Sequence, residues 1–356
     1  MSTLTMPSIT IAFATAAESA VSRSQKGTVA LILRDAALAG NHYELTRPAA
    51  VPDTMGAENK AAVNRAFLGY VRPPRRVLLY VLDAAAPLKA ALSWLETQQF
   101  DYLAGPDTVT AAEATSIAAW VKTQRTERNA ICKAVLPDTA ADSEGIVNFT
   151  TAGIVSGTET FSAAAYCGRM AGLLAGTPME LSGTFATLPE VSNVTRLTQA
   201  EMNTAVGAGK LLLWYDGEKV KTGRAVNSLQ TMGGKTAVWK KIKIVEFLDM
   251  VQRDIRKTAQ DTFIGKYPNT YDSRMLLVTA IRDYLARLAR EGLLAADFLC
   301  DIDVRAVERW LQWQGVDTTV MSEQQIRESN TDTEVYLKLT LRPVDSIEDI
   351  SVLIYL

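Results

Sequence analysis

RAVNSLQT at residues 224–231 begins the stretch of the chain that decides the fold, and this stretch continues to Leu294. A Gly-Gly break follows at 233–234, and then come two long amphipathic runs that meet at the turn IGKYPNTYDS, residues 264–273. These patterns predict a strand followed by a hairpin of two helices with charged outer faces. The stretch places no catalytic group in a position to react, which favours a part that holds other chains.

The two amphipathic runs each carry one apolar stripe at helical spacing. The first run, 240–263, is expected to end before Gly265. The second is expected to begin at a cap formed by Asp272 or Ser273. The stripes consist of Ile244, Leu248, Val251, Ile255 and Ala259 in the first run and of Leu277, Ile281, Leu285 and Leu288 in the second.

Basic side chains lie away from these stripes on both runs. Such a face most often meets water, and nearby aspartates balance its charge, but it could instead attract an acidic partner. Nucleic acid is disfavoured, because the formal charge is −2, the pI is near 5.7, and no basic motif is interleaved with aromatic residues. The selected basic residues are Lys243, Arg253, Arg256, Lys257, Arg274, Arg282 and Arg290.

The first 155 residues alternate between strand and helix patterns. Strands are expected at 27–34, 75–82, 100–103 and 129–136, with helices between them. This alternation predicts an α/β layer domain with parallel pairs of strands. The nucleotide-binding fingerprint G-x-G-x-x-G does not follow the first strand, so the sheet alone gives no reason to expect a nucleotide.

Further elements are expected after residue 155. Residues 161–175 form a helix whose many small residues permit close backbone approach. The Asp216-Gly217 pair predicts a hairpin turn. The other expected elements are helices at 198–206 and 304–314 and strands at 210–215, 220–229, 335–344 and 350–355.

Residues with acid–base or metal chemistry are few. The single histidine, His42, lies in a Gly-Asn-His-Tyr loop with no cysteine or carboxylate cluster beside it. Asp83 follows a predicted strand, where it would cap the next helix or serve in catalysis. These two residues are the candidates for an alternative function, a cytosolic α/β enzyme acting on a small molecule. Zinc, esterase and P-loop motifs are missing, and we expect neither a metal nor a cofactor.

Cysteine usage and hydropathy point to a reducing compartment without membrane insertion. Cys132, Cys167 and Cys300 are widely spaced and odd in number, so buried free thiols in a reducing cytosol are expected. No run of eighteen apolar residues occurs, and the N-terminus lacks a basic n-region and a clean apolar h-region. We therefore expect no transmembrane helix, no signal peptide and no direct membrane insertion.

Apolar strand patterns lie near both ends of the chain. An exposed apolar strand is an aggregation hazard unless another strand pairs with it. The pattern alone favours an edge strand of the chain's own sheet, and the alternative is a strand donated to another subunit. The residues are Ile9, Ile11 and Phe13 near the N-terminus and Ile350, Val352 and Ile354 near the C-terminus.

Several segments, in their order and spacing, resemble one known family. They are AAYCGRMAGLLAG (164–176), LSGT (181–184), GRAVNSLQT (223–231), the helix around Asp254-Ile255, FIGK (263–266) with Asn269, AIRDYL (280–285) and the two terminal strands. The chain resembles the tail sheath proteins of contractile phage tails and R-type bacteriocin particles, in the compact form found in prophages and bacteriocins. The resemblance is densest over the C-terminal half.

The resemblance implies a structural subunit that is not an enzyme. Such subunits stack as hexameric rings around an inner tail tube protein, with baseplate and tail terminator proteins at the ends and no nucleic acid. Their terminal arms donate strands to neighbouring subunits, and one helix of the C-terminal domain contacts the tube. Contraction proceeds by rigid-body rotation without ATP and drives the tube through a target envelope. Assembly in the host bacterial cytoplasm, into a virion tail or bacteriocin particle, is implied.

These implied roles assign linking to the six apolar terminal residues and tube contact to the seven basic residues named above. The sheath of another contractile injection system remains a second possibility. The predicted fold is mixed α/β (α+β), with two to three α/β layer domains and extended N- and C-terminal strand arms. The predicted parts are an N-terminal linking arm at 1–25, an outer variable domain at 26–155, a sheath core with the tube-proximal C-terminal domain at 156–345, and a C-terminal linking strand at 346–356.

Overall fold

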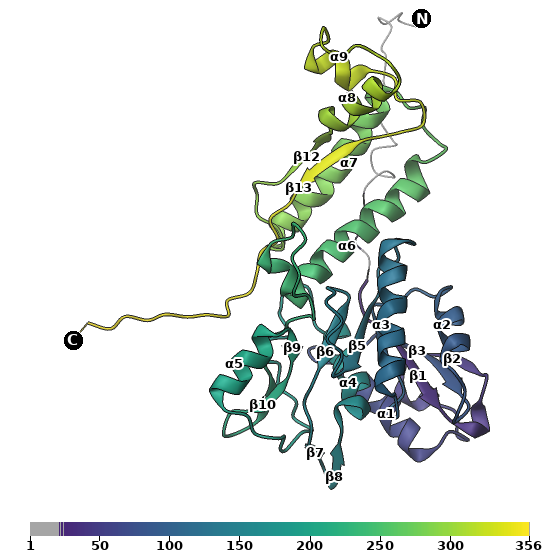
Figure 1. Cartoon of the computed structure of the whole chain (residues 1–356), viewed down its shortest axis with the longest axis vertical. Helices are drawn as coiled ribbons and strands as arrows, with labels where there is room; N and C mark the ends of the chain where they lie inside the picture. The colour runs from purple at the N-terminus through teal and green to yellow at the C-terminus, as the bar shows by residue number, and fades with distance from the viewer. Residues whose placement is uncertain (1–20, 22, 24, 356) are drawn as a thin grey trace, which may run out of the picture. The chain divides into compact units, whose positions relative to one another are not determined.

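The computed structural model of the chain describes residues 21, 23 and 25–355 (Figure 1). It divides into two compact units. The sheet unit contains residues 25–249 and returns at 345–355, and the hairpin unit contains residues 250–344 with the described residues 21 and 23. The predicted mixed α/β fold is confirmed. The predicted division at residue 155 stays a prediction, and within the single chain one sheet takes strands from both sides of that point.

Among the described residues, the sheet unit contains a seven-stranded sheet in the order β2-β3-β1-β4-β5-β6-β9. Neighbouring strands are parallel, except that β2 runs antiparallel to β3. The parallel α/β layer is therefore confirmed, whereas β2 and β6 were not predicted. The strands are β1 (Thr28–Arg34), β2 (His42–Leu45), β3 (Arg76–Leu82), β4 (Tyr102–Ala104), β5 (Lys133–Pro137), β6 (Ile146–Phe149) and β9 (Lys210–Leu211).

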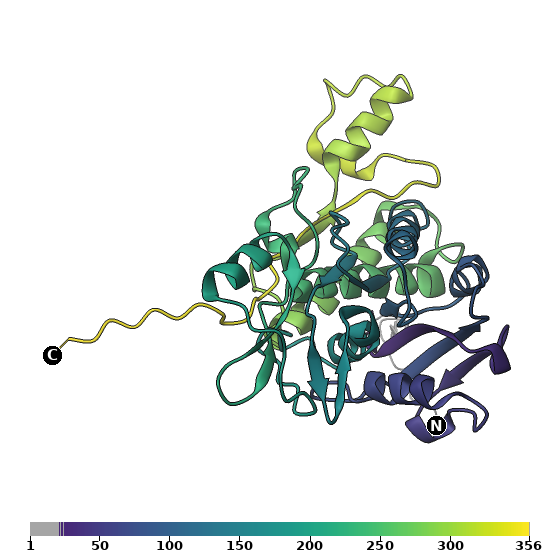
Figure 2. The ribbon, with the colours of Figure 1, turned by 60° about the horizontal axis from the view of Figure 1, so that its bottom comes forward.

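Helices cover both faces of this sheet (Figure 2). In β1, Leu31 packs with the cluster of α1 and α4, and Ile32 packs with the cluster of α2 and α3. A strand that is buried on both faces reads as a continuous apolar run, which is why β1 and β3 were recognisable. The helices are α1 (Ala57–Phe67), α2 (Lys89–Leu95), α3 (Ala111–Thr126) and α4 (Ala163–Ala175).

Two glycines of the segment 164–176 allow the close backbone approach that its small residues predicted. A Cβ at Gly172 would lie 1.9 Å from the carbonyl oxygen of Ala66 in α1, and one at Gly176 would lie 2.1 Å from that of Arg72. Both contacts are far shorter than a van der Waals contact, so backbone atoms would have to move. Close packing of α4 against α1 therefore depends on Gly172, and close packing of the end of α4 against the loop after α1 depends on Gly176.

Shorter elements complete the sheet unit. The helix predicted at 198–206 is α5 (Gln199–Gly207), which starts from a capping box between Thr198 and Glu201. The predicted turn at Asp216-Gly217 joins β10 (Leu213–Tyr215) to β11 (Val220–Thr222) in an antiparallel hairpin. The remaining elements are the paired strands β7 (Ile154–Ser156) and β8 (Glu159–Phe161) and the short helices η2 (Ala36–Leu38), η3 (Pro48–Ala50) and η4 (Ala237–Lys240).

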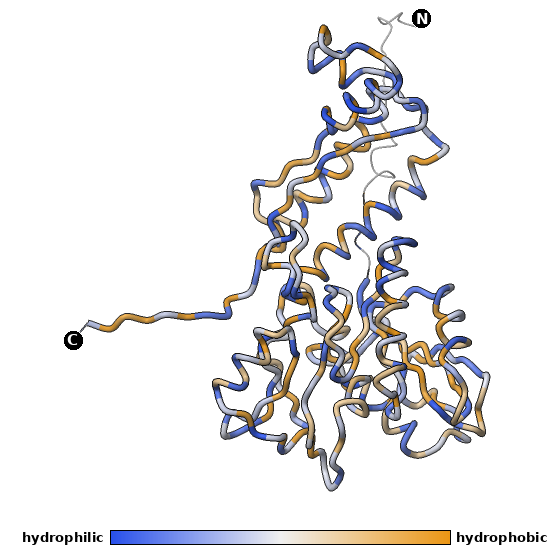
Figure 3. Tube along the Cα trace, viewed as in Figure 1, coloured by the Kyte–Doolittle hydropathy of each residue, from blue (hydrophilic) through white to orange (hydrophobic). Residues whose placement is uncertain are grey.

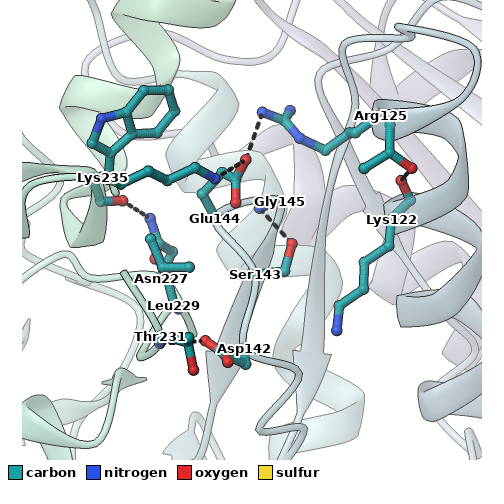
Figure 4. A network of polar contacts seen from close by, with 12 residues as sticks. Lys122, Arg125, Asp142, Ser143, Glu144, Gly145, Asn227, Leu229, Thr231 and Lys235 are labelled. Carbon is teal, nitrogen blue, oxygen red and sulfur yellow. Dashed lines mark hydrogen bonds and ion pairs between the residues drawn. The ribbon is translucent and has the colours of Figure 1, made fainter. Parts of the chain in front are cut away.

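The predicted strand at 220–229 is wrong beyond Thr222, because the later backbone groups bond to side chains and to separate backbone segments instead of forming a ladder with one strand (Figure 4). Asp142 Oδ1 accepts hydrogen bonds from the backbone amides of Gln230 at 2.6 Å and Thr231 at 2.8 Å. Hydrogen bonds from Thr231 and Gln230 hold the pKa of Asp142 at about 2. The hydroxyl of Ser228 donates to the carbonyl of Ser143 at 2.9 Å. This segment is therefore fixed but irregular.

The hairpin unit contains the predicted pair of helices. The first helix, α6 (Ile242–Thr258), begins in the sheet unit and continues through a π-helical turn at Ala259–Phe263. The second, α7 (Tyr271–Arg290), starts from Thr270, whose hydroxyl accepts from the Ser273 amide at 3.2 Å. The predicted cap at Asp272 or Ser273 is therefore wrong by a few residues. The buried hydroxyl of Tyr284 donates to Asp254 Oδ2 at 2.7 Å, which joins the two helices.

A small sheet and two helices form the rest of the hairpin unit. The predicted strand at 335–344 is shorter in the structure, where β13 (Leu337–Thr340) pairs antiparallel with β12 (Leu299–Ile302). Asn269 donates to the carbonyls of Asp332 at 2.8 Å and Glu334 at 3.0 Å, and so holds the loop before β13. The helices are α8 (Val304–Trp313), close to its predicted range, and α9 (Glu323–Glu328).

A buried charge network holds the first turns of α6 against the sheet. Asp249 Oδ1 and Oδ2 accept from the Arg125 guanidinium at 2.9 and 3.1 Å, and Oδ2 also accepts from the Lys133 ammonium at 2.9 Å. Burial raises the pKa of Asp249, but Lys133 and Arg125 outweigh this effect and hold the pKa below its usual value. Arg125 also lies 4.0 Å from Glu144, which pairs with Lys235 at 3.0 Å (Figure 4).

Glu246, one turn earlier on α6, extends the same network. It accepts from Lys26 at 2.6 Å and from the hydroxyl of Tyr102. Lys26 stands just before β1, while Tyr102 and Lys133 are the first residues of β4 and β5. Burial lowers the pKa of Lys26 although Glu246 opposes that effect. The start of α6 is thus tied to the amino ends of three parallel strands.

We predict that Asp249→Asn lowers the free energy of unfolding of the sheet unit by about 3–5 kcal/mol, because it leaves the buried Lys133 and the partly buried Arg125 without their carboxylate. Urea denaturation would measure this. Folding lowers the pKa of Asp249 below its usual value of 3.8. The carboxylate therefore stabilises the folded state above pH 3.8, and this stabilisation is lost as the pH falls through the lower pKa of the folded state. The difference between wild type and variant should therefore narrow only below about pH 3.8.

The matched control is Asp297→Asn, which removes a carboxylate from an exposed pair with Arg342 at 2.8 Å. An exposed pair contributes about 0–1 kcal/mol, so this variant should unfold almost like wild type. Equal effects of the two substitutions would contradict the role given to Asp249.

Candidate interaction site at the C-terminal segment

The chain ends in a segment with two different halves. The root, Asp345–Asp349, is mostly polar, and the tip, Ile350–Tyr355, is mostly apolar (Figure 3). Neither half forms a helix or strand in the described part of the chain. The tip runs as an extended trace from the sheet unit, to which the whole segment belongs (Figure 1).

The root is held by cations from two other parts of the sheet unit. Lys241, just before α6, lies 2.5 Å from Asp345 Oδ2 and 3.0 Å from Glu348 Oε2. Arg224 pairs with Asp349, and its Nε lies 3.6 Å from Glu348. Partial burial lowers the pKa of Lys241, but its hydrogen bonds with Asp345 and Glu348 outweigh this effect and raise the pKa.

Glu348 is the most enclosed acid of the root, since only 5% of its side chain is exposed. Its Oε1 accepts from the hydroxyl of Thr184 at 2.6 Å and from that of Ser182 at 3.4 Å. Thr184 Oγ1 in turn accepts from the amide of Ala225 at 3.0 Å. The carboxylate therefore receives hydroxyl donors on one oxygen and cations on the other.

Lys243, on the first turn of α6, completes these contacts. It donates to the hydroxyl of Ser346 at 2.9 Å and to the carbonyl of Glu180 at 3.1 Å. Burial lowers its pKa, and nearby acids including Asp345 oppose this effect. We call the five residues that hold the root the clasp; they are Ser182, Thr184, Arg224, Lys241 and Lys243.

The clasp gives a physical role to two of the quoted segments. LSGT supplies the hydroxyl donors, and GRAVNSLQT supplies Arg224. Sequence reasoning did not find the clasp, because its partners lie more than a hundred positions apart. The only local signal was the acidic pattern Asp345, Glu348 and Asp349 directly before an apolar end.

The tip is exposed throughout. Ile350 is 77% exposed, and Val352 and Ile354 are each 76% exposed. The predicted strand at 350–355 is not formed, because no strand of the described chain pairs with it. The corresponding N-terminal residues Ile9, Ile11 and Phe13 lie outside the described residues. The described residues just after them contact α7, where Arg287 donates to the carbonyl of Val21 and Glu291 pairs with Arg23 at 2.8 Å.

The seven basic residues selected for tube contact do not share one environment. Lys243 and Arg274 are buried and bond within their own units, Lys243 in the clasp and Arg274 to the Ser329 carbonyl at 2.9 Å. Arg282 is partly exposed and donates to the Cys300 carbonyl at 2.7 Å. Arg253 and Arg256 are partly exposed as well, and Lys257 and Arg290 are exposed. The tube-contact role stays a prediction for all seven.

The two candidates for catalysis, His42 and Asp83, have different contact partners. His42 is exposed on β2 rather than in a loop, and its ring lies 5.1 Å from that of Trp94. Asp83 is exposed, and its Oδ1 accepts from the Ala84 amide at 2.7 Å. The expected cap on the next helix is wrong, because Leu88 occupies the N-cap of α2.

Cysteine and metal chemistry add no site to the described chain. Cys132, Cys167 and Cys300 are free and buried, as predicted. Burial raises the pKa of the Cys300 thiol to about 11. Over residues 21, 23 and 25–355, no three metal-binding side chains gather as they would around an ion. Over the same residues, every helix is too short or too polar to cross a membrane.

Comparison with known proteins gives the family. Residues 84–228 match the phage tail sheath protein central domain, and residues 234–356 match the phage tail sheath C-terminal domain. A tail sheath protein of Clostridium phage phiCD119 is 33% identical over 350 residues, which cover 97% of each chain. The chain belongs to the phage tail sheath protein family, as the quoted segments predicted.

Solved structures share the fold over most of the chain. The helical sheath of the anti-feeding prophage in its contracted state has a TM-score of 0.73 at 16% identity and covers 99% of both chains. The sheath tail protein from Listeria innocua has a TM-score of 0.68 at 17% identity, covering 92% of this chain and 97% of that one. The fold is therefore that of sheath proteins from phage-like and contractile injection particles.

We predict that Glu348→Gln loosens the root, because glutamine keeps the shape but removes the charge that Lys241 and Arg224 face. A nitroxide on Ile347→Cys, at an 86% exposed position of the root itself, would report the motion, and the three native thiols are buried. Losing a charged hydrogen bond costs about 1.5–3 kcal/mol. The population of mobile label should therefore rise about ten- to hundredfold.

Glu218→Gln in the exposed β10–β11 turn provides the control for this measurement, since it removes one carboxylate outside the clasp. Its spectrum should equal that of the labelled parent. A Glu348→Gln spectrum that is equally unchanged would show that the clasp does not restrain the root.

Proposed function

We propose that the chain polymerises as stacked rings of six subunits around an inner tube, and that contraction of this sheath drives the tube through a target envelope. The observation that carries the proposal is the tip, an exposed, extended apolar segment whose root is fixed by the clasp. Apolar side chains on an unpaired extended backbone favour pairing with another chain. The sequence relationship to tail sheath proteins supports this assembly.

The β12–β13 sheet is the proposed receiver of the donated strands. Within the described residues it has only two strands, and a sheet of that size is marginally stable by itself. A tip from one neighbour and the N-terminal strand around Ile9, Ile11 and Phe13 from another would extend it to four strands. Each contact joins different surfaces on the two subunits, so repetition produces a helical array rather than a closed pair.

Contraction is proposed to move subunits as rigid bodies while the donated strands stay paired. A two-state change of interfaces needs no catalysis in the subunit. The anti-feeding prophage sheath is known in a contracted state, and its fold covers 99% of this chain, which supports a similar change here. We therefore propose a structural role and no enzymatic one, with baseplate and terminator proteins at the ends of the array. Assembly would take place in the bacterial cytoplasm.

Contact with the tube is proposed for the exposed cations of the hairpin unit. Lys257 and Arg290 are the strongest candidates for tube contact among the seven selected residues, because both are exposed. Arg253, Arg256 and Arg282 are partly exposed and would support them. The buried Lys243 and Arg274 are poorly placed to reach a partner. An acidic tube surface would complement this set of charges.

The linking role predicts a loss of assembly in the triple variant Ile350→Asp, Val352→Asp and Ile354→Asp. The yield of sheath polymers should fall at least about tenfold. Three charges on one face would have to be buried without partners, at a cost of several kcal/mol. Sedimentation and electron microscopy of hollow tubes would measure the yield. The conservative control is Ile350→Val with Val352→Ile and Ile354→Val, which should polymerise like wild type. Equal yields from the charged variant, or no polymer from wild type, would refute the proposal.

Tube contact predicts that Lys257→Glu combined with Arg290→Glu weakens assembly around the tube more than assembly of free sheath. Reversed charge would repel an acidic surface, and close charge pairs across interfaces contribute about 1.5–7 kcal/mol. Co-sedimentation with purified tube would be compared with tube-free polymerisation. Arg342→Glu, at another exposed cation, serves as control. Equal loss in both assays would assign these residues to folding or sheath contacts instead.

A further inference from the structure

The tip lacks the pattern that normally fixes the register of a strand. In a strand that is buried on one face, alternation of apolar and polar residues sets which face turns inward, and a slip by one residue reverses every side chain. Ile350, Val352 and Ile354 occupy one face of the tip, but Leu353 and Tyr355 occupy the other. Only Ser351 is polar in Ile350–Tyr355. Both faces are therefore suited to burial, and the tip alone does not select between registers.

The N-terminal strand pattern differs in this respect. Its larger side chains, Ile9, Ile11 and Phe13, all fall on one face, and the intervening positions are Thr10 and Ala12. That pattern alone specifies which face of the N-terminal strand is buried. Only the C-terminal tip therefore needs another part of the chain to set its register.

The clasp holds the root directly beside the tip. Glu348 is fixed by Thr184, Ser182 and Lys241, and Asp349 is paired with Arg224. Ile350 follows Asp349 without a linker residue. An extended chain advances about 3.3 Å per residue, so a fixed Asp349 leaves little freedom in the position of Ile350.

We infer that the clasp sets the register of the donated strand, so that Ser182, Thr184, Arg224, Lys241 and Lys243 act as positioning residues for strand exchange. This inference rests on the proposed linking function. By holding residues 345–349, the clasp determines which face of the tip meets the neighbour. It also determines how far along the receiving sheet each residue pairs.

The test inserts one, two or three alanines between Asp349 and Ile350 in the full chain. If the clasp sets the register, one insertion reverses the faces, two restore them with a shift along the strand, and three reverse them again. Polymer yield should fall at least about tenfold with one or three insertions and recover at least partly with two. Melting of the unassembled chain serves as the folding control, since the tip is exposed and its lengthening should leave the transition unchanged.

A second measurement tests whether the insertion effect depends on the clasp. In chains carrying Arg224→Gln and Lys241→Gln, one inserted alanine should change the polymer yield less than about twofold, because the root can then slide. An equally large insertion effect in this background would overturn the inference.

The outcomes separate this inference from the proposed function. Polymers that tolerate one or three insertions as well as two would refute register control and leave strand donation intact. A steady decline with insertion length would likewise refute it, since tether length and not facing would then govern assembly. Failure of the unmodified chain to polymerise would instead refute the proposed function.

Discussion

The ion pairs of Asp249 with Arg125 and Lys133 are the interaction on which the rest of the structure depends. They hold the first turns of α6 against the sheet of the same unit, through one cation from α3 and one from β5. A buried carboxylate between a buried and a partly buried cation is costly to displace, so it fixes both the position and the rotation of the start of α6. That placement brings Lys241 and Lys243 to the root of the C-terminal segment. The arrangement of the end of the chain thus follows from charges buried far from it in sequence.

Local periodicity predicted much of this fold. β1 and β3 were found because burial on both faces gives continuous apolar runs, and α6 and α7 were found because each carries a stripe at helical spacing. The same reasoning failed between Gly223 and Thr231, where backbone amides bond to Asp142 and to the separate carbonyls of Lys240 and Ile146 instead of to one neighbouring strand. Bonds between distant side chains leave no periodic signal.

The candidate site was predicted only in part. The apolar tip was visible as a strand pattern, but the pattern could not show that the chain contains no partner for it. Lys243 looked like one member of a solvated basic face, whereas it is buried against Ser346 and Glu180. The local sequence around a charged residue does not show whether its partner lies about a hundred positions away or whether the charge is solvated. The quoted segments around Ser182 and Arg224 indicated the family before their contacts with Glu348 gave them a physical role.

The return of the chain to the sheet unit at Asp345 has a mechanical consequence. Residues 250–344 form a closed excursion, since the same unit holds the chain both before it, through Asp249, and after it, through the root. Lys241 and Asp345 close this loop without a covalent crosslink. A pull on the tip would therefore reach the sheet unit first, at the clasp. Within one subunit, that tension would not have to pass through residues 250–344 to reach Asp249, because the root is held directly by the sheet unit.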